Sequence, residues 1–295
     1  MATKTESQLQ SWTGQASDAE QARYEWTKGQ IREALRGGTI DQYSFEVYPK
    51  GSYPNHTNVV RDSDVDIAVE LTEIQRHEFT HSAKDLSLED FGISRYMGGY
   101  SVDLFKNDVE AALRRQFGGS AVERGNKAIH VRESARGLKA DVVVCQTLKS
   151  HPNPLVSSTR TGILISPDRG PKIHNFPKHH LDEGVRKNDA TNRRYKRLVR
   201  IVKRMENEMV ANNIIPVVPS FLMESMVWNV PNRIFNYNDT WTSRLRESLG
   251  HIYNTDRSEW LEANNIKFLF HTSQAWSEGD AMTFVERAWR YMGFN

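Results

Sequence analysis

The pattern of apolar and polar positions divides the chain into a first region that mixes strands with helices and a second region that is almost wholly helical. In the first region the pattern predicts helices at 19–35 and 101–117, strands at 43–48, 62–71, 121–132, 138–147 and 162–165, and mixed helix and loop between 75 and 100. Beyond about residue 178 the apolar repeat predicts helices around 195–209 and at 219–229, 239–251, 256–263 and 279–292. We therefore expect an α+β region, residues 1–175, and a helical domain, residues 176–295.

Composition narrows the class of protein. The 295 residues carry 39 Lys and Arg against 37 Asp and Glu, a net charge of +2, which does not suit a protein that coats nucleic acid. The longest apolar runs are too short to cross a bilayer, and residues 1–12 have no apolar stretch typical of a signal peptide. A single cysteine, Cys145, excludes internal disulfides and thiolate-rich zinc sites. We expect a soluble cytoplasmic protein.

Paired carboxylates carry the most specific chemistry. Asp64 and Asp66 lie two residues apart in a predicted strand, so they project from one face, which Asp62 would share, while Val65 and Ile67 point into a core. Carboxylates crowded on one face repel each other unless a cation lies between them, and hard oxygen ligands suit Mg²⁺ or Mn²⁺. Asp141 begins another apolar strand. Three carboxylates can hold two metal ions for an in-line attack on a phosphate.

A Gly-Ser turn precedes these carboxylates. Gly51 and Ser52 follow a predicted strand and are separated from Asp64 by eleven residues. Such a turn offers backbone N–H groups and a hydroxyl to a triphosphate. An Asp-x-Asp pair alone is common on solvated strand edges. A catalytic site is indicated by the order of the motifs along the chain: the Gly-Ser turn, then the paired aspartates, then a single aspartate on a later strand. Tyr53 and Asn55 are interpreted either as nucleotide contacts or as turn residues, and Ser157 and Ser158 as candidate base contacts.

A basic helix follows in the second region. Lys196, Arg200 and Lys203 are spaced to form one basic stripe beside the apolar one. This stripe could be a solvated helix face, a triphosphate site or an RNA-binding ridge. The histidines at 174, 179 and 180 fit no zinc spacing and are interpreted as surface or turn residues.

At these residues the chain resembles the DNA polymerase β-like nucleotidyltransferases. More narrowly, residues 51–67 are similar to the bacterial CD-NTases, cyclic-oligonucleotide synthases related to cyclic GMP-AMP synthase. Two further blocks support the narrower match: Asn175–His180 leading through Gly184–Asn188 to Tyr195–Arg200, and Pro219–Glu224 continuing to Trp228–Asn232. The resemblance covers residues 43–232.

The resemblance implies a nucleotidyltransferase core, a mixed sheet with flanking helices, joined to a helical domain like those of oligoadenylate synthases and poly(A) polymerases. The active site is expected in the cleft between the two, and the N-terminal helix can pack across both lobes. Asp64 and Asp66 would hold both metals, and Asp141 the metal that activates the attacking ribose hydroxyl. The triphosphate would be bound by Gly51 and Ser52, by Lys203 with Lys196 in reserve, and more weakly by Ser220.

The implied activity is Mg²⁺-dependent condensation of NTPs into a cyclic di- or trinucleotide for bacterial anti-phage signalling, with Mn²⁺ as a substitute metal. A separate effector protein would bind the product, and the resemblance is also compatible with a regulatory partner protein. The implied reaction requires neither a nucleic acid nor a membrane. Two alternatives stay open: a template-independent transferase acting on RNA ends or on protein, and a non-catalytic nucleotide or RNA sensor. The bases, linkage and ring size are not indicated by the sequence.

Overall fold

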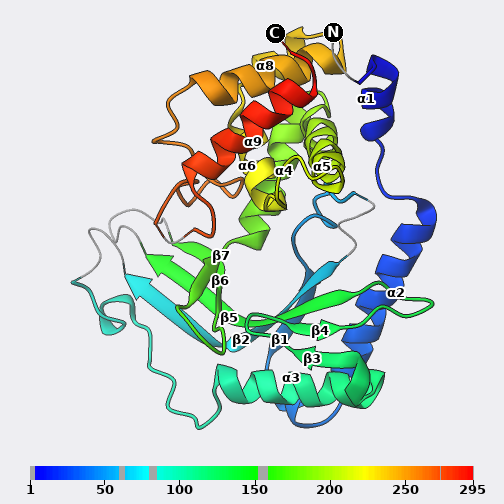
Figure 1. The fold of residues 1–295 in the computed structure, drawn as a ribbon. Coiled ribbons are helices and arrows are strands. Elements are labelled where there is room, and N and C mark those ends of the chain that lie inside the picture. The colour runs from blue at the N-terminus through cyan, green and yellow to red at the C-terminus, as the bar shows by residue number, and fades with distance from the viewer. Residues whose placement is uncertain (1–3, 60–63, 80–84, 152–158, 273, 295) are drawn as a thin grey trace. The chain divides into compact units, whose positions relative to one another are not determined.

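The computed structural model describes residues 4–59, 64–79, 85–151, 159–272 and 274–294 (Figure 1). The chain forms two compact units. The sheet unit contains Ser17–Lys50 and Ser63–Pro177, and the helical unit contains Met1–Ala16, Gly51–Asp62 and Lys178–Asn295. Both units are thus discontinuous: residues 1–16 and 51–62 precede the expected boundary at 175/176 but belong to the helical unit.

In its described residues the sheet unit has seven strands and two long helices. The helices are α2 (Asp18–Ala34) and α3 (Val102–Phe117). The strands are β1 (Phe45–Pro49), β2 (Val65–Phe79), β3 (Val122–Arg124), β4 (Ile129–Val131), β5 (Ala140–His151), β6 (Arg160–Ile165) and β7 (Ile173–Asn175). Short 3₁₀ turns lie at Thr39–Gln42, Glu89–Phe91 and Gly119–Ala121.

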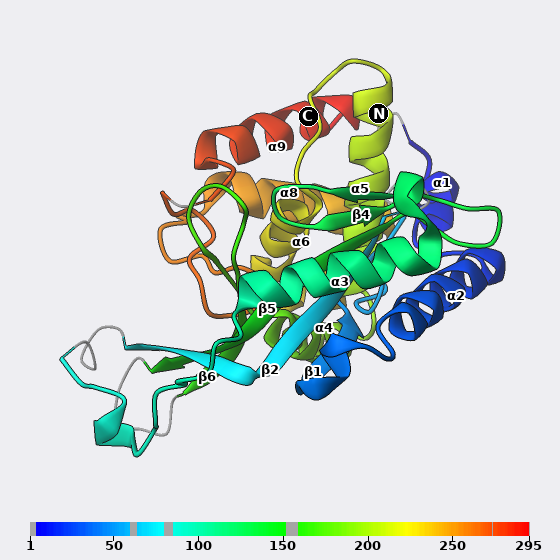
Figure 2. The ribbon, with the colours of Figure 1, turned by 90° about the horizontal axis from the view of Figure 1, so that it is seen from below.

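Strand order in the sheet is β1-β2-β5-β4-β3, and β6 pairs with β5 and β7. The two central strands, β2 and β5, are parallel, whereas every other pairing is antiparallel. Helix α3 lies along one face of the sheet (Figure 2). On β2, Val65, Ile67 and Val69 are fully buried, as the alternation predicts. The predicted α+β mixed-sheet class is confirmed.

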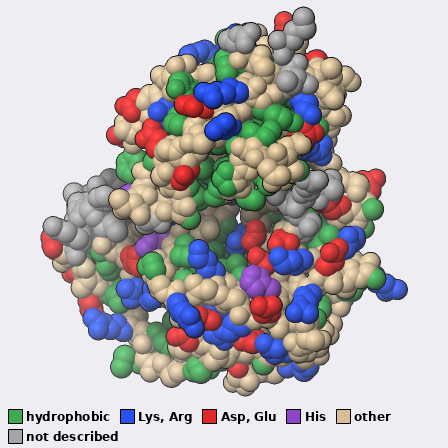
Figure 3. All heavy atoms as spheres, in the orientation of Figure 1, with side chains coloured by type: hydrophobic (Ala, Val, Ile, Leu, Met, Phe, Trp, Pro, Cys, Tyr) green, Lys and Arg blue, Asp and Glu red, His purple; other side chains and the backbone are tan. Residues whose placement is uncertain are grey.

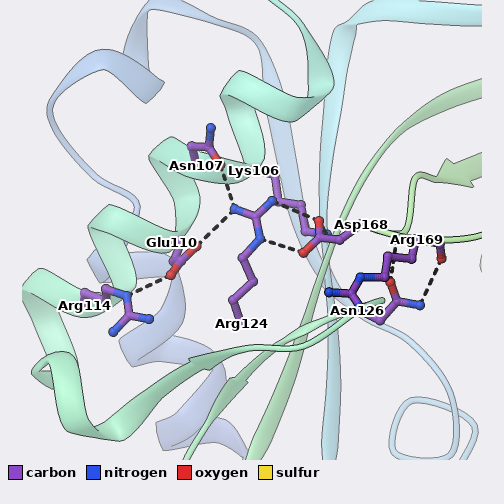
Figure 4. A network of polar contacts seen from close by, with 8 residues as sticks. All are labelled: Lys106, Asn107, Glu110, Arg114, Arg124, Asn126, Asp168 and Arg169. Atoms are coloured by element: carbon purple, nitrogen blue, oxygen red, sulfur yellow. Dashed lines mark hydrogen bonds and ion pairs between the residues drawn. The ribbon is translucent and has the colours of Figure 1, made fainter.

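Ion pairs tie α3 to the loop after β6 (Figure 4). The Asp168 carboxylate accepts hydrogen bonds from Arg124 Nε and Nη2, at 2.8 and 2.9 Å, and from Lys106 Nζ at 2.7 Å. Lys106 is only 3% exposed, whereas the Asp168 side chain is 35% exposed. Hydrogen bonds from Arg124 and Lys106 hold the pKa of Asp168 well below its usual range. Arg124 also binds Glu110 on α3 at 3.1 Å.

The helical unit packs around α5. Its helices are α1 (Glu6–Trp12), α4 (Pro177–Ala190), α5 (Tyr195–Ala211), α6 (Ser220–Asn229), α7 (Asn232–Tyr237), α8 (Trp241–Asn254) and α9 (Glu278–Tyr291). Eleven of the residues on α5 are buried, including Leu198, Val202 and Met205 in the core. Across the described part of the chain, no helix combines the length and apolarity needed to span a membrane.

Three regional predictions are corrected by the structure. Residues 256–263 do not form a helix: Leu261 pairs with Phe268 in an isolated bridge, and Asn265 takes a positive φ of 58° in the tight turn between them. The region from residue 75 is also not helix and loop throughout, because β2 continues to Phe79. The strand predicted at 121–132 is a hairpin of two short strands.

Lys187 on α4 yields a pH-dependent prediction for stability. Its Nζ donates to the Val230 carbonyl at 2.7 Å, and burial lowers its pKa to about 8. Between this value and the unfolded pKa near 10.5, the unfolded chain binds more protons, so stability should rise with pH. Relative to Lys187→Met, wild type should gain about 2 kcal/mol in the free energy of unfolding from pH 7 to pH 10. Urea unfolding of both proteins tests this, and a constant difference would contradict it.

Candidate active site

Asp66 and Asp141 lie side by side on the two central strands. The parallel register of β2 and β5 pairs them Cα to Cα, so both side chains project from the same face about 4.8 Å apart along the sheet. Their strand neighbours Val65 and Val142 are fully buried on the opposite face. The two carboxylates are 39% and 26% exposed and are therefore accessible to a ligand.

Each predicted carboxylate has a different basic partner. The Lys50 Nζ lies 3.2 Å from Asp66 Oδ1, and the Lys139 Nζ lies 2.5 Å from Asp64 Oδ2. His130, which faces Asp141 across β4 and β5, places its Nδ1 2.7 Å from Asp141 Oδ1. Two Lys cations and a hydrogen bond with His130 thus offset the repulsion that the sequence predicts between these carboxylates.

The carboxylate chemistry fits a hard divalent cation at Asp66 and Asp141. Asp64 lies just before β2 with its carboxylate turned toward Lys139, and among the described residues no three His, Cys, Asp or Glu side chains surround a common point. A bound cation would therefore take the place of the Lys partners, while His130 stays hydrogen-bonded to Asp141. On the face of the sheet unit seen in Figure 3, acidic side chains are interspersed with Lys, Arg and His. Asp62, Ser157 and Ser158 lie outside the described residues.

The Gly-Ser turn begins where β1 ends. Lys50 N–H donates to the Asp66 carbonyl, and Gly51 follows with a φ of 75°, a left-handed conformation that favours glycine. From Gly51 the chain belongs to the helical unit. Ser52 is half-buried in this turn, whereas Tyr53 and Asn55 are 4% and 1% exposed. The Asn55 side chain contacts Gly51 and His180 of the helical unit.

The basic stripe predicted on α5 is not an exposed face. Lys196, Arg200 and Lys203 are 7%, 3% and 1% exposed, so an RNA-binding ridge formed by these three side chains is excluded in this structure. Other parts of the helical unit cover them: Arg200 Nη1 donates to the His56 carbonyl, and its Nε donates to the Thr13 carbonyl at 2.8 Å. Helical periodicity predicts that these side chains share one face of α5, but it does not predict whether other segments of the chain cover that face.

The candidate phosphate residues therefore have different surroundings. Lys196 borders the turn, because a Cβ at Gly184 would lie 3.8 Å from Lys196 Cε and 2.8 Å from Asn55 Oδ1. Burial lowers the pKa of Lys196. Lys203 lies near Glu224 and helps to lower the pKa of that carboxyl, while Ser220 begins α6 and is half-buried.

Sequence reasoning missed the residues that support this site. His130 lies in the alternating stretch Ile129–Val131, where it projects to the face opposite its two buried neighbours, and this alternation was the available signal. The interpretation of His180 as a surface or turn residue is wrong, because its side chain is 6% exposed and bonds Glu224. No local pattern predicts that pair, since its members are 44 residues apart.

Comparisons with known proteins agree with this arrangement. Residues 182–293 match the family model of the cGAS/DncV-like nucleotidyltransferase C-terminal helical domain. A cyclic dipyrimidine nucleotide synthase CdnE from Cecembia lonarensis is 37% identical over 302 residues, covering 100% of both chains.

Two solved structures share the fold over nearly the whole chain. The Rhodothermus marinus CdnE c-UMP-AMP synthase with Apcpp and Upnpp has a TM-score of 0.85 and 29% identity, covering 99% of this chain and 98% of that one. The Elizabethkingia meningoseptica CdnE cyclic dinucleotide synthase with GTP and Apcpp has a TM-score of 0.80 and 32% identity, covering 99% and 100%. With the paired aspartates on parallel strands and the Gly-Ser turn before them, this chain belongs to the cGAS/DncV-like nucleotidyltransferases, the CD-NTases.

Proposed function

We propose that this enzyme condenses two NTPs into a cyclic dinucleotide with Mg²⁺ held by Asp66 and Asp141, and by Asp64 once its carboxylate turns from Lys139 to the metal. The observation that carries the proposal is the register pairing of Asp66 with Asp141, which brings two accessible carboxylates together on one face of the sheet. The identity to CdnE synthases over the full chain supports the same reaction. Mn²⁺ has the same preference for oxygen ligands and is the expected substitute.

When bound, the metal would supply Lewis-acid stabilisation of the phosphates and make the attacking ribose hydroxyl more acidic. The protein would supply the rest of the chemistry. Asp141 would accept the hydroxyl proton, with its carboxylate oriented by the hydrogen bond to His130. The backbone N–H groups of Gly51 and Ser52 and the Ser52 hydroxyl would bind the donor triphosphate.

Lys196 is the better candidate for a further phosphate contact. Its position beside Asn55 places it near the turn, and burial, which lowers its pKa, would make a phosphate charge a favourable neighbour. Lys203 interacts instead with Glu224. Ser220, at the first residue of α6, stays a weaker proposal.

The names of two relatives point to pyrimidine use, whereas the Elizabethkingia meningoseptica structure holds GTP and Apcpp. The Cecembia lonarensis relative is a dipyrimidine synthase, and the Rhodothermus marinus structure holds a uridine analogue. We therefore propose UTP as one substrate. As in the family, the product would be a second messenger read by a separate effector protein in anti-phage defence.

The test is a labelled-product assay. The purified protein is incubated with each labelled NTP, and with all four, in Mg²⁺ or Mn²⁺, and the products are resolved after phosphatase treatment. We expect a phosphatase-resistant product that requires UTP and disappears when EDTA is in excess of the metal. Linear products extended from an acceptor would indicate a terminal transferase. Nucleotide binding with the same affinity in EDTA, and no pyrophosphate release, would indicate a sensor.

A further inference from the structure

A buried, hydrogen-bonded pair of side chains lies inside the helical unit. Glu224 on α6 and His180 on α4 are 2% and 6% exposed, and His180 Nε2 lies 2.9 Å from Glu224 Oε1. Burial acts to raise the pKa of Glu224, but His180, Lys203 and the Thr57 hydroxyl together hold it below its usual range. Glu224 is therefore a buried carboxylate, and such a group is retained only where hydrogen bonds satisfy it.

The partners of this pair are in the Gly-Ser turn. Thr57 Oγ1 donates to Glu224 Oε2 at 3.0 Å. Because His180 Nε2 donates to Glu224, its Nδ1 is an acceptor, and it lies 3.2 Å from Asn55 Nδ2. The same Asn55 amide donates to the Gly51 carbonyl at 3.1 Å.

These bonds form a closed ring. The backbone completes it, since Thr57 N–H donates to the Ser52 carbonyl at 3.0 Å. Both oxygens of one carboxylate thus reach the turn, one directly through Thr57 and one through His180 and Asn55. Residues 51–56 form no helix or strand, so these side chains supply much of what fixes their conformation.

A helical glycine is part of the same arrangement. Gly184 lies inside α4, where glycine costs about 1 kcal/mol relative to alanine. A Cβ at this position would lie 2.8 Å from Asn55 Oδ1, closer than such atoms approach. Asn55 is 1% exposed and has little room to move. The glycine therefore leaves space for the turn.

We propose that Glu224, acting through His180 and Thr57, is a positioning residue that sets the Gly51–Thr57 turn for triphosphate binding. The inference rests on the proposed role of Gly51 and Ser52 as triphosphate ligands. A shift of the turn by a fraction of an ångström would misalign N–H groups that must point at phosphate oxygens. The triphosphate contacts are made both before and during reaction, so their loss should raise KM more than it lowers kcat.

Gly184→Ala is the most direct test. Alanine favours the helix, so the variant should fold, and its methyl group should displace Asn55. We expect KM for UTP, and Kd for the analogue Upnpp measured by calorimetry with Mg²⁺, to rise about tenfold, with kcat within twofold of wild type. The matched control is Gly250→Ala on α8, where an added Cβ would meet its nearest atom at an ordinary 3.7 Å. It should leave KM and Kd unchanged.

Thr57→Val gives a second, independent perturbation. It keeps the shape of the side chain and removes only the hydroxyl that donates to Glu224. It should also raise KM and Kd severalfold, because it leaves one buried carboxylate oxygen without that donor. In a protein that already carries Asn55→Ser, adding Gly184→Ala should change KM and Kd no further. The added methyl group would no longer contact the Asn55 side-chain amide.

Folded variants with wild-type KM and Kd would overturn the proposal, as would an effect of Gly184→Ala that adds fully to that of Asn55→Ser. These outcomes require that wild type binds Upnpp and forms product. A wild type that does neither would instead contradict the proposed function. The two failures are therefore distinguishable.

Discussion

Replacing Asp66 by asparagine is expected to lower the rate of cyclic product formation by about 10³-fold, equivalent to about 4 kcal/mol of lost transition-state stabilisation. Asparagine keeps the shape but removes the negative charge that would hold the metal beside Asp141. The side chain is 39% exposed, and an asparagine oxygen can still accept a hydrogen bond from Lys50, so the fold should be little affected. The measurement is the rate of cyclic product formation at saturating NTP and Mg²⁺.

The matched control is Asp103→Asn. Asp103 is an exposed carboxylate in the first turn of α3, and α3 lies against the opposite face of the sheet. It should retain wild-type activity. Equal activity of Asp66→Asn and wild type, with both folded, would remove Asp66 from the proposed metal site.

Replacing Asp168 by alanine is expected to lower the free energy of unfolding by about 3 kcal/mol. The Lys106 side chain is only 3% exposed, and the substitution removes the carboxylate to which its ammonium donates. Arg124 loses two hydrogen bonds at the same time. The depressed pKa of Asp168 fixes the sign of the pH dependence. This stabilisation is present above the unfolded pKa of about 4 and is lost as the pH falls toward the lower folded value.

Urea unfolding of wild type and Asp168→Ala at pH 7 measures the effect. Glu33→Ala is the matched control, because it removes an Arg–carboxylate pair of 2.8 Å whose side chains are 76% and 54% exposed. It should cost less than about 0.5 kcal/mol. Equal losses in the two variants would show that the Asp168 pairs act as ordinary surface pairs.

Local features of this protein were predictable from the sequence, and contacts distant in sequence were not. The helix predicted at 101–117 is observed as α3, because its apolar repeat and its capping residue Ser101 are local signals. The pairing of Asp66 with Asp141 depends on a parallel register that alternation within one strand cannot specify.

Burial of polar residues was the main source of error. Lys196 and Arg200 share a helix face, but the segments that cover it come from residues 1–16 and 51–62, far away in the chain. The bond from Thr57 to Glu224 likewise joins residues 167 positions apart. Such contacts are determined by the tertiary fold, which overrides the local preference of a charged residue for water.

The discontinuity of the helical unit affects how this protein can be recombined with its relatives. A chimaera that exchanged only the matched helical segment, residues 182–293, would separate Glu224 from His180, Asn55 and Thr57. The buried carboxylate would then face side chains from another parent. If the exchange also included residues 1–16, 51–59 and 178–181, all side chains of the hydrogen-bonded ring would come from the same parent protein. For protein engineers, the exchangeable module is therefore three separate pieces of sequence.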